Sequence, residues 1–278
     1  MDTAKAMEPF GYELSCDFTV ENAAEIQRQF SKHGLVIARN QSLTKQDQID
    51  VLSELGTVLR HDSTLNTVSN VRKDGFLGDV EVNWHSDASY TERPQHAISL
   101  HALRIERPGE TSTKIASAWR ALERLPDALR ERAEPLSAMH LAAVGAGTLG
   151  GRQRLADYPT QGPRAIHPVV KTDPVTGRDC LYLPYTNVDH LIGLSERESQ
   201  ELLDELQAYL YAPDNVYEHF WHDGDVMVWS NMGCMHRRGA MPGGERTLNR
   251  VATSDATVQM YEESTSILRG QRLNAMMK

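Results

Sequence analysis

The residues that could carry out chemistry begin with a histidine and an aspartate two positions apart, His85 and Asp87. Side chains on an extended segment alternate with a period of two, so the two would point to the same face. An imidazole and a carboxylate on one face can bind a single metal ion, and a carboxylate that points inward is costly to bury without a cation. Two ligands make a poor metal site, so the prediction requires a third.

The best candidate for the third ligand is His236, which follows the strand-like segment 224–231 by five positions. A jelly roll could bring it back against the first pair. Two neutral imidazoles and one carboxylate, with the opposite face open, form the facial triad that suits non-haem Fe(II) reacting with dioxygen. The alternative is an exposed loop acid beside a surface histidine, with no metal.

Two arginines, Arg246 and Arg250, follow His236 closely. Their even separation would place both on one face of the last predicted strand. Two inward guanidinium groups would be unpaired buried charges unless an anion meets them, and guanidinium is suited to bidentate carboxylate binding. The alternative is that they pair with protein acids such as Asp225, or with solvent.

Composition and charge favour a globular enzyme with a small substrate. The 278 residues are 40% hydrophobic and 24% charged, and no apolar run approaches the roughly 20 residues needed to span a bilayer. The N-terminus lacks the pattern of a secretory signal, so we expect a cytoplasmic protein. A formal charge of -9 disfavours nucleic acid as a partner. Three cysteines without C-x-x-C spacing argue against a disulfide framework and a thiolate zinc site.

Many short strands with helices between them predict a closed or sandwiched β core with flanking helices. We expect one domain over residues 1–278, with a core at about 10–255 and a polar tail at 256–278. The Gly-rich stretch 143–163 predicts a long loop, either an active-site lid or a disordered segment. Strands are predicted at 10–14, 34–39, 97–103, 167–171, 180–183, 216–221, 226–229 and 247–253, short strands and loops at 60–82, and helices after residues 22, 44, 116, 126 and 195.

These motifs, in this order and spacing, resemble those of the taurine/2-oxoglutarate dioxygenases, a family that includes 2,4-dichlorophenoxyacetate dioxygenase. The resemblance runs from about Phe10 to Asp255. It is carried by the segments 34–39, 69–71, 84–87, 108–111 and 167–170, by Gly224-Asp225 with Trp229 and Asn231, and by His236 with Arg246 and Arg250.

By this resemblance His85, Asp87 and His236 would bind iron, and Thr111 with Arg246 would bind the distal carboxylate of 2-oxoglutarate. Arg250 would contact an acidic group of the substrate or assist cosubstrate binding. One departure concerns the cosubstrate pocket: two positions after Thr111 the family often has a large apolar or aromatic residue, whereas this chain has Thr113.

The resemblance implies a double-stranded β-helix, that is a mainly β jelly roll of the cupin-like kind with flanking helices. It also implies an Fe(II)- and 2-oxoglutarate-dependent dioxygenase that hydroxylates or desaturates an unactivated C–H bond and releases succinate and CO2. We expect a small substrate carrying a carboxylate, sulfonate or phosphonate and no membrane partner, with a homo-oligomer as one option for the assembly. Two alternatives remain, namely a β-barrel zinc hydrolase or lyase and a non-catalytic relative that binds a small molecule.

Overall fold

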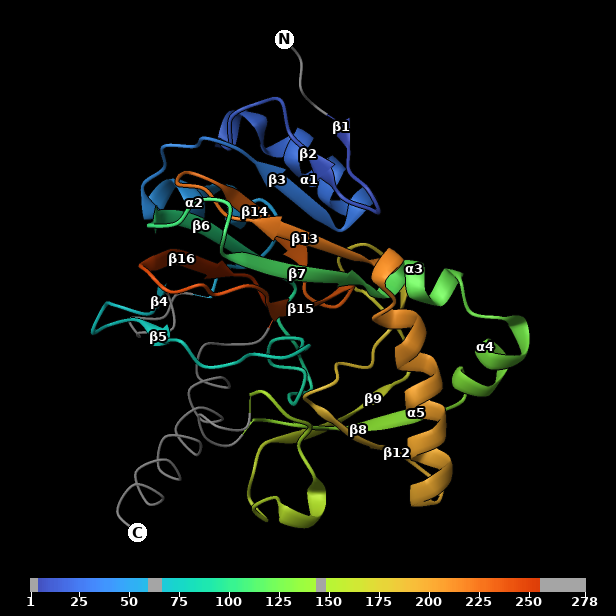
Figure 1. The fold of residues 1–278 in the computed structure, drawn as a ribbon. Helices are drawn as coiled ribbons and strands as arrows, with labels where there is room; N and C mark the ends of the chain where they lie inside the picture. The colour runs from blue at the N-terminus through green and yellow to red at the C-terminus, as the bar shows by residue number, and fades with distance from the viewer. Residues whose placement is uncertain (1–4, 60–66, 144–148, 256–278) are drawn as a thin grey trace.

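The computed structural model describes residues 5–59, 67–143 and 149–255. Its main feature is an eight-stranded sheet built from segments far apart in the sequence (Figure 1). The central strands are almost entirely buried, because both faces of the sheet are covered. The order across the sheet is β1 (Lys5–Ala6), β2 (Tyr12–Glu13), β3 (Leu35–Ala38), β14 (Val226–Ser230), β6 (Ala97–Ile105), β16 (Arg246–Ala252), β4 (Thr67–Ser69) and β5 (Phe76–Leu77).

A second sheet of three antiparallel strands packs on the inner face of the first: β13 (Val216–Phe220), β7 (Ser112–Ser117) and β15 (Cys234–Arg238). One hydrophobic cluster joins the two sheets, with Ile115 of β7 packed among residues of β6, β14 and β16. Two facing sheets of this kind make a jelly roll, in which inward side chains of both sheets reach one interior. That interior holds the candidate site.

Two helices cover the outer face of the large sheet, α1 (Ala23–His33) and α2 (Lys45–Ser53). Their apolar residues, such as Ile26 and Phe30, share a cluster with Val36 and with the outward valines of β14. This layer keeps the strands that carry Arg246 and Arg250 in place from behind.

The remaining described elements lie beside the jelly roll (Figure 1). The helices predicted after residues 44 and 195 are confirmed as α2 and the long helix α5, which packs there against β12; each begins with a capping box, at Thr44 and Asp47 and at Ser195 and Glu198. No helix in the described part of the chain is long and apolar enough to cross a membrane. These elements are α3 (Ala118–Glu123), α4 (Asp127–Ala133), β8 (Ser137–Leu141), β9 (Arg164–Pro168), β10 (Val170–Thr172), β11 (Asp179–Leu181), β12 (Val188–Leu191), α5 (Glu196–Leu210) and the short helices η4 (Leu155–Asp157) and η5 (Pro213–Asn215). The short helix η1 (Val20–Asn22) instead precedes α1 and contacts α1 and α2.

The structure corrects the predicted elements at several points, and the strands β7, β12 and β15 are among those that were not predicted. The strand predicted at 167–171 is two strands, β9 and β10, which break after Pro168 because proline has no N–H to donate to a ladder. The strand β8 was not predicted, since its five residues lie immediately after a helix and a proline. The described part of the predicted loop 143–163 contains one helical turn. Residues 60–66, 144–148 and the tail 256–278 lie outside the described residues.

Gly34 offers a test of how tightly the layers pack. It ends α1 with φ of 71°, and a Cβ there would lie 2.5 Å from the Cζ3 of Trp119. Gly193 also has a positive φ, 87°, but a Cβ there would meet nothing within 4 Å. Gly193→Ala should therefore cost only the left-handed backbone strain, roughly 1 kcal/mol, whereas Gly34→Ala should cost about 1–3 kcal/mol more through overpacking. Urea unfolding measures both; equal losses would contradict the packing described.

Candidate metal centre

The two candidate histidines are brought together by a backbone bridge. His85 N–H donates to the carbonyl of His236 and His236 N–H donates to the carbonyl of His85, each at 3.0 Å. The two residues are 151 positions apart in the chain, yet this pairing places their ring centroids 4.0 Å apart. His236 lies on β15, opposite Ile115 of β7, so its side chain shares the interior of the jelly roll.

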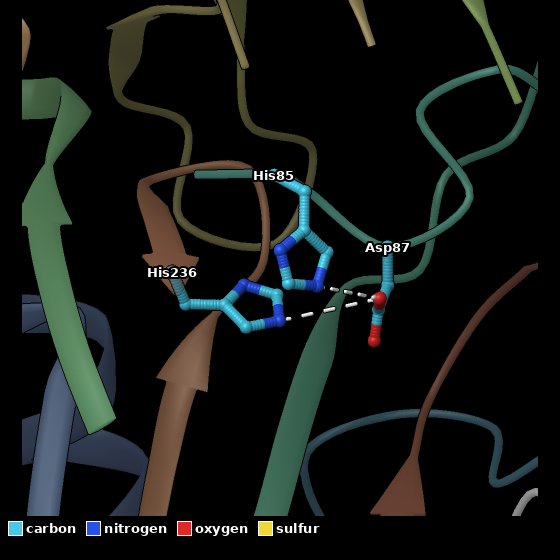
Figure 2. A group of neighbouring side chains, drawn as sticks. All are labelled: His85, Asp87 and His236. Carbon is cyan, nitrogen blue, oxygen red and sulfur yellow. Dashed lines mark ion pairs between the residues drawn. The ribbon is translucent and has the colours of Figure 1, made fainter. Parts of the chain in front are cut away.

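Asp87 completes the group, although not for the reason that the sequence suggested. Only His85 is paired as in a strand; the chain turns at Asp87, and Ala88 has a positive φ of 58°, so the prediction of one extended segment is wrong. The carboxylate nevertheless points at both rings (Figure 2). Its Oδ1 lies 3.5 Å from the Nε2 of His85 and 4.0 Å from the Nε2 of His236. One ligand atom from each residue lies within 4.8 Å of the others, and the described residues contain no other such group.

The protonation states suit metal binding. The Nδ1 of His85 lies 2.8 Å from the carbonyl of Asn83, so Nδ1 carries the proton and the Nε2 lone pair faces the centre. Burial, followed by the closeness of the His85 ring, lowers the pKa of His236 well below its usual range, which keeps that imidazole neutral. Burial raises the pKa of Asp87, but the nearby Arg250 and the two histidines outweigh it and hold the pKa well below the usual value. Two neutral imidazoles and one carboxylate are the donor set of a facial triad.

Asn231 explains why the chain turns at Asp87. Its side-chain Oδ1 accepts from the Asp87 N–H at 2.9 Å, and its Nδ2 donates to the Asp87 and Gln95 carbonyls, each at 2.8 Å. Ser86 Oγ donates to the Asn231 carbonyl at 2.8 Å. A fully buried amide therefore holds the backbone on both sides of the carboxylate. Such outer contacts orient the ligands of metal sites.

The two arginines, Arg246 and Arg250, have different surroundings. The Nη2 of Arg250 lies 2.5 Å from the Oδ2 of Asp87 and also contacts Gln95, so for Arg250 the alternative of pairing with a protein acid holds. The acid it pairs with is not Asp225, which accepts from Arg39 at 2.8 Å instead. Nothing in the sequence predicted that Gln95 would contact Arg250.

Arg246 is buried, with 5% of its surface exposed, and none of the ion pairs found among the described residues includes it. Its Nη2 donates to the hydroxyl of Thr113 at 3.2 Å, and its Nε has no partner there. Burial, followed by the nearby charge of Arg238, lowers the pKa of Arg246 to about 9. The guanidinium therefore remains protonated at neutral pH and is available to an anion.

Thr111 is buried beside these groups, and its hydroxyl donates to the Sδ of Met241 at 3.3 Å. The threonine that contacts Arg246 is Thr113, which the sequence marked only as a departure from the family pattern. Arg238 was missed, although its even spacing from His236 on one strand would have placed it on the same face.

Comparison with known proteins places this geometry in a family. Residues 4–252 match the family model described as taurine catabolism dioxygenase TauD, TfdA family. The chain belongs to this family. It is therefore an Fe(II)- and 2-oxoglutarate-dependent dioxygenase acting on a small organic substrate, and the zinc and non-catalytic alternatives are not favoured.

Individual relatives are more distant. The chain is 30% identical to a pentalenolactone F synthase from Streptomyces arenae over 203 residues, which cover 67% of each protein. It is 26% identical over 257 residues to the α-ketoglutarate-dependent 2,4-dichlorophenoxyacetate dioxygenase of Cupriavidus pinatubonensis, which covers 84% of this chain and 89% of that one.

Solved structures confirm the predicted jelly roll. A taurine dioxygenase from Burkholderia xenovorans superposes with a TM-score of 0.74 at 22% identity, over 91% of this chain and 90% of that one. AAD-2 in complex with Mn(II) and N-oxalylglycine superposes with a TM-score of 0.75 at 24% identity, over 92% and 98% of the two chains. At these identities the likeness is one of fold.

Asn231 provides a test of the metal centre that leaves its three ligands intact. Asn231→Ala should weaken Mn(II) binding about 10- to 100-fold, because the backbone on both sides of the Asp87 carboxylate loses its support. The control is Asn215→Ala, which removes another buried amide that joins two backbone carbonyls, those of Ser117 and Leu210. Electron paramagnetic resonance of free Mn(II) measures both; the account fails if the two variants bind equally well.

Proposed function

We propose that His85, Asp87 and His236 bind Fe(II) through the two Nε2 atoms and the Asp87 carboxylate. The observation that carries this proposal is that the three ligand atoms share one place and already have the protonation states a metal needs. When bound, Fe(II) with 2-oxoglutarate and dioxygen supplies the oxidising power that attacks an unactivated C–H bond, with release of succinate and CO2. The protein's part is to fix the geometry, exclude water and place one C–H bond at the open face.

The cosubstrate is positioned, in this proposal, by Arg246 together with Thr111. Arg246 is a buried guanidinium that carries its charge and no ion pair to an acid among the described residues. A carboxylate would neutralise that charge and accept from its free N–H groups, which are arranged for bidentate contact. The distal carboxylate of 2-oxoglutarate is such a group.

The substrate, we further propose, carries an anionic group that Arg250 contacts. Among the described residues, Arg250 contacts Asp87 and Gln95, both through Nη2, so the other nitrogens of the guanidinium can donate elsewhere. Support comes from relatives, which include an (S)-phenoxypropionate/α-ketoglutarate dioxygenase of Sphingobium herbicidovorans and an alkylsulfatase of Acinetobacter baylyi. Because Arg250 also touches Asp87, a bound anion would sit beside the metal ligand itself.

The chain as a whole we take to be one domain over residues 1–278, with its core at about 10–255. In support, the large sheet includes strands from both ends of the described chain, β1 and β16. The three cysteines, Cys16, Cys180 and Cys234, are free thiols, which fits the reducing interior of a cell.

The metal assignment is tested by anaerobic titration with Fe(II) and 2-oxoglutarate. The wild-type protein should develop a weak visible charge-transfer band, and His85→Ala or His236→Ala should abolish it, since two of three ligands cannot hold the ion. His222→Ala is the control, because 55% of that side chain is exposed and it lies outside the group. A wild type without the band, and without succinate from any sulfonate, phosphonate, aryloxy acid or amino acid tried, would contradict the proposal.

The role of Arg246 has its own test. Arg246→Met keeps the apolar stem and removes the charge, so half-saturation should need at least about 30 times more 2-oxoglutarate while Fe(II) binding is unchanged. Arg104→Met, which removes an exposed arginine paired with Asp223, is the control and should behave as wild type. Calorimetry under argon gives both constants; an unaltered 2-oxoglutarate requirement in Arg246→Met would exclude the assigned role.

A further inference from the structure

Thr113 lies at an unusual point in the hydrogen-bond network of the interior. Its hydroxyl oxygen accepts from the indole N–H of Trp221 at 3.0 Å and from the Nη2 of Arg246 at 3.2 Å. Thr113 and Trp221 are both buried, with 4% and 0% of their surfaces exposed. Two strong donors therefore fix this hydroxyl from two sides.

The hydroxyl group of Thr113 keeps one unused hydrogen-bonding group, the O–H donor. A threonine oxygen has two acceptor lone pairs and one proton to donate. The Trp221 and Arg246 N–H groups occupy both lone pairs, so the O–H must point elsewhere. No hydrogen bond donated by Thr113 is found among the described residues, and a buried donor without an acceptor is costly.

The surroundings of Thr113 contain several donors and few acceptors. The Nε of Arg246 has no partner among the described residues, and Arg238 faces Thr113 directly across the β7–β15 pair. Arg238 donates to the carbonyls of Gly78 and Val80 at 2.7 and 2.8 Å; Asp79 lies close enough to act on its charge, but no ion pair between Arg238 and an acid is found among the described residues. Two partly or fully buried cations and a free O–H form a subsite that favours an anion with several acceptor oxygens.

The register places this subsite at a definite distance from the metal centre. His236 is paired with Ile115, and Thr113 lies two residues further along the same face of β7, about 6.6 Å away at 3.3 Å per residue. A five-carbon diacid, with four carbon–carbon bonds of about 1.5 Å, spans roughly 5 Å when extended. Thr111 lies another two residues towards the N-terminus, just before β7 begins. Thr113 is therefore nearer than Thr111 to the metal centre, and it is Thr113 that contacts Arg246.

We infer that the Thr113 hydroxyl, oriented by Trp221, donates to the distal carboxylate of 2-oxoglutarate beside Arg246 and so makes the site selective for a diacid. This inference rests on the cosubstrate role proposed for Arg246. Thr113 is a further donor there, beside Arg246 and Thr111, because its O–H points away from both groups that fix it. The residue that departs from the family pattern thus supplies a polar contact at a position where the family often has a large apolar side chain.

The test compares two keto acids of equal chain length, 2-oxoglutarate and 2-oxopentanoate, which has a methyl group in place of the distal carboxylate. Calorimetry of the Mn(II)-loaded protein under argon gives both dissociation constants without turnover. Thr113→Val removes the hydroxyl at nearly constant volume and should weaken 2-oxoglutarate binding at least about tenfold. It should leave 2-oxopentanoate binding unchanged. Thr113→Ser, which keeps the hydroxyl, should bind both acids within about threefold of wild type.

The control is Thr247→Val, which removes a buried hydroxyl adjacent in sequence to Arg246 that instead contacts Ser69 and Glu245. It should leave both constants unchanged. A Thr113→Val variant that binds 2-oxoglutarate as wild type does, or that loses affinity for both acids equally, would overturn the inference. Thr113→Ala serves in the same comparison if the valine variant does not fold.

Donation to the ligand is distinguished from mere orientation of Arg246 by adding Thr113→Val to Arg246→Met. If Thr113 donates to the carboxylate, the double variant prefers 2-oxoglutarate less than Arg246→Met alone does. If Thr113 only orients Arg246, the second substitution changes nothing further and the inference is wrong. A wild type that does not discriminate between the two acids would instead remove the proposed role of Arg246, and that of Thr113 with it.

Discussion

The site depends on one backbone interaction, the mutual hydrogen bonding of His85 and His236. Neither residue lies near the other in sequence, and Asp87 reaches the same place only because it follows His85 around a turn that Asn231 holds. The jelly roll makes this pairing possible, since the segment before Asp87 runs beside β15 and pairs with it at His236, the middle residue of that strand. The layers of helices and strands around it keep that meeting point fixed, while 17% of the His85 side chain and 25% of the Asp87 side chain stay exposed.

Charge is distributed unequally around this centre. The carboxylate of Asp87 is balanced by Arg250, so the ligand stays ionised and oriented at the same time. Arg246 and Arg238 have no comparable acid among the described residues and contact neutral oxygens. The chain has nine more acidic than basic residues, yet Arg246 and Arg238 form no ion pair with an acid in the described part of the chain, which favours anionic ligands at this position. A diacid cosubstrate and an anionic substrate both fit this unequal distribution of charge around the metal centre.

The sequence predicts which residues form the site better than it predicts the backbone geometry and contacts that position them. Residue types and order were sufficient to select His85, Asp87, His236 and the arginines, because few other chemistries use that set. Periodicity could not show that Asp87 lies on a turn, since the amide that causes the turn comes from a residue 144 positions away. The contact of Arg250 with Asp87 could likewise not be predicted from the sequence. Capping boxes and the hairpin at β10 and β11 were predictable because their interactions are local.

The central claim is that three side chains from two distant segments bind one metal ion. The most direct measurement is an anaerobic crystal structure with Mn(II) and N-oxalylglycine, with the ion located by its anomalous scattering. The account predicts a single Mn(II) bonded to Nε2 of His85, Nε2 of His236 and the Asp87 carboxylate. An ion bound elsewhere, or bound without one of these three side chains, would contradict it.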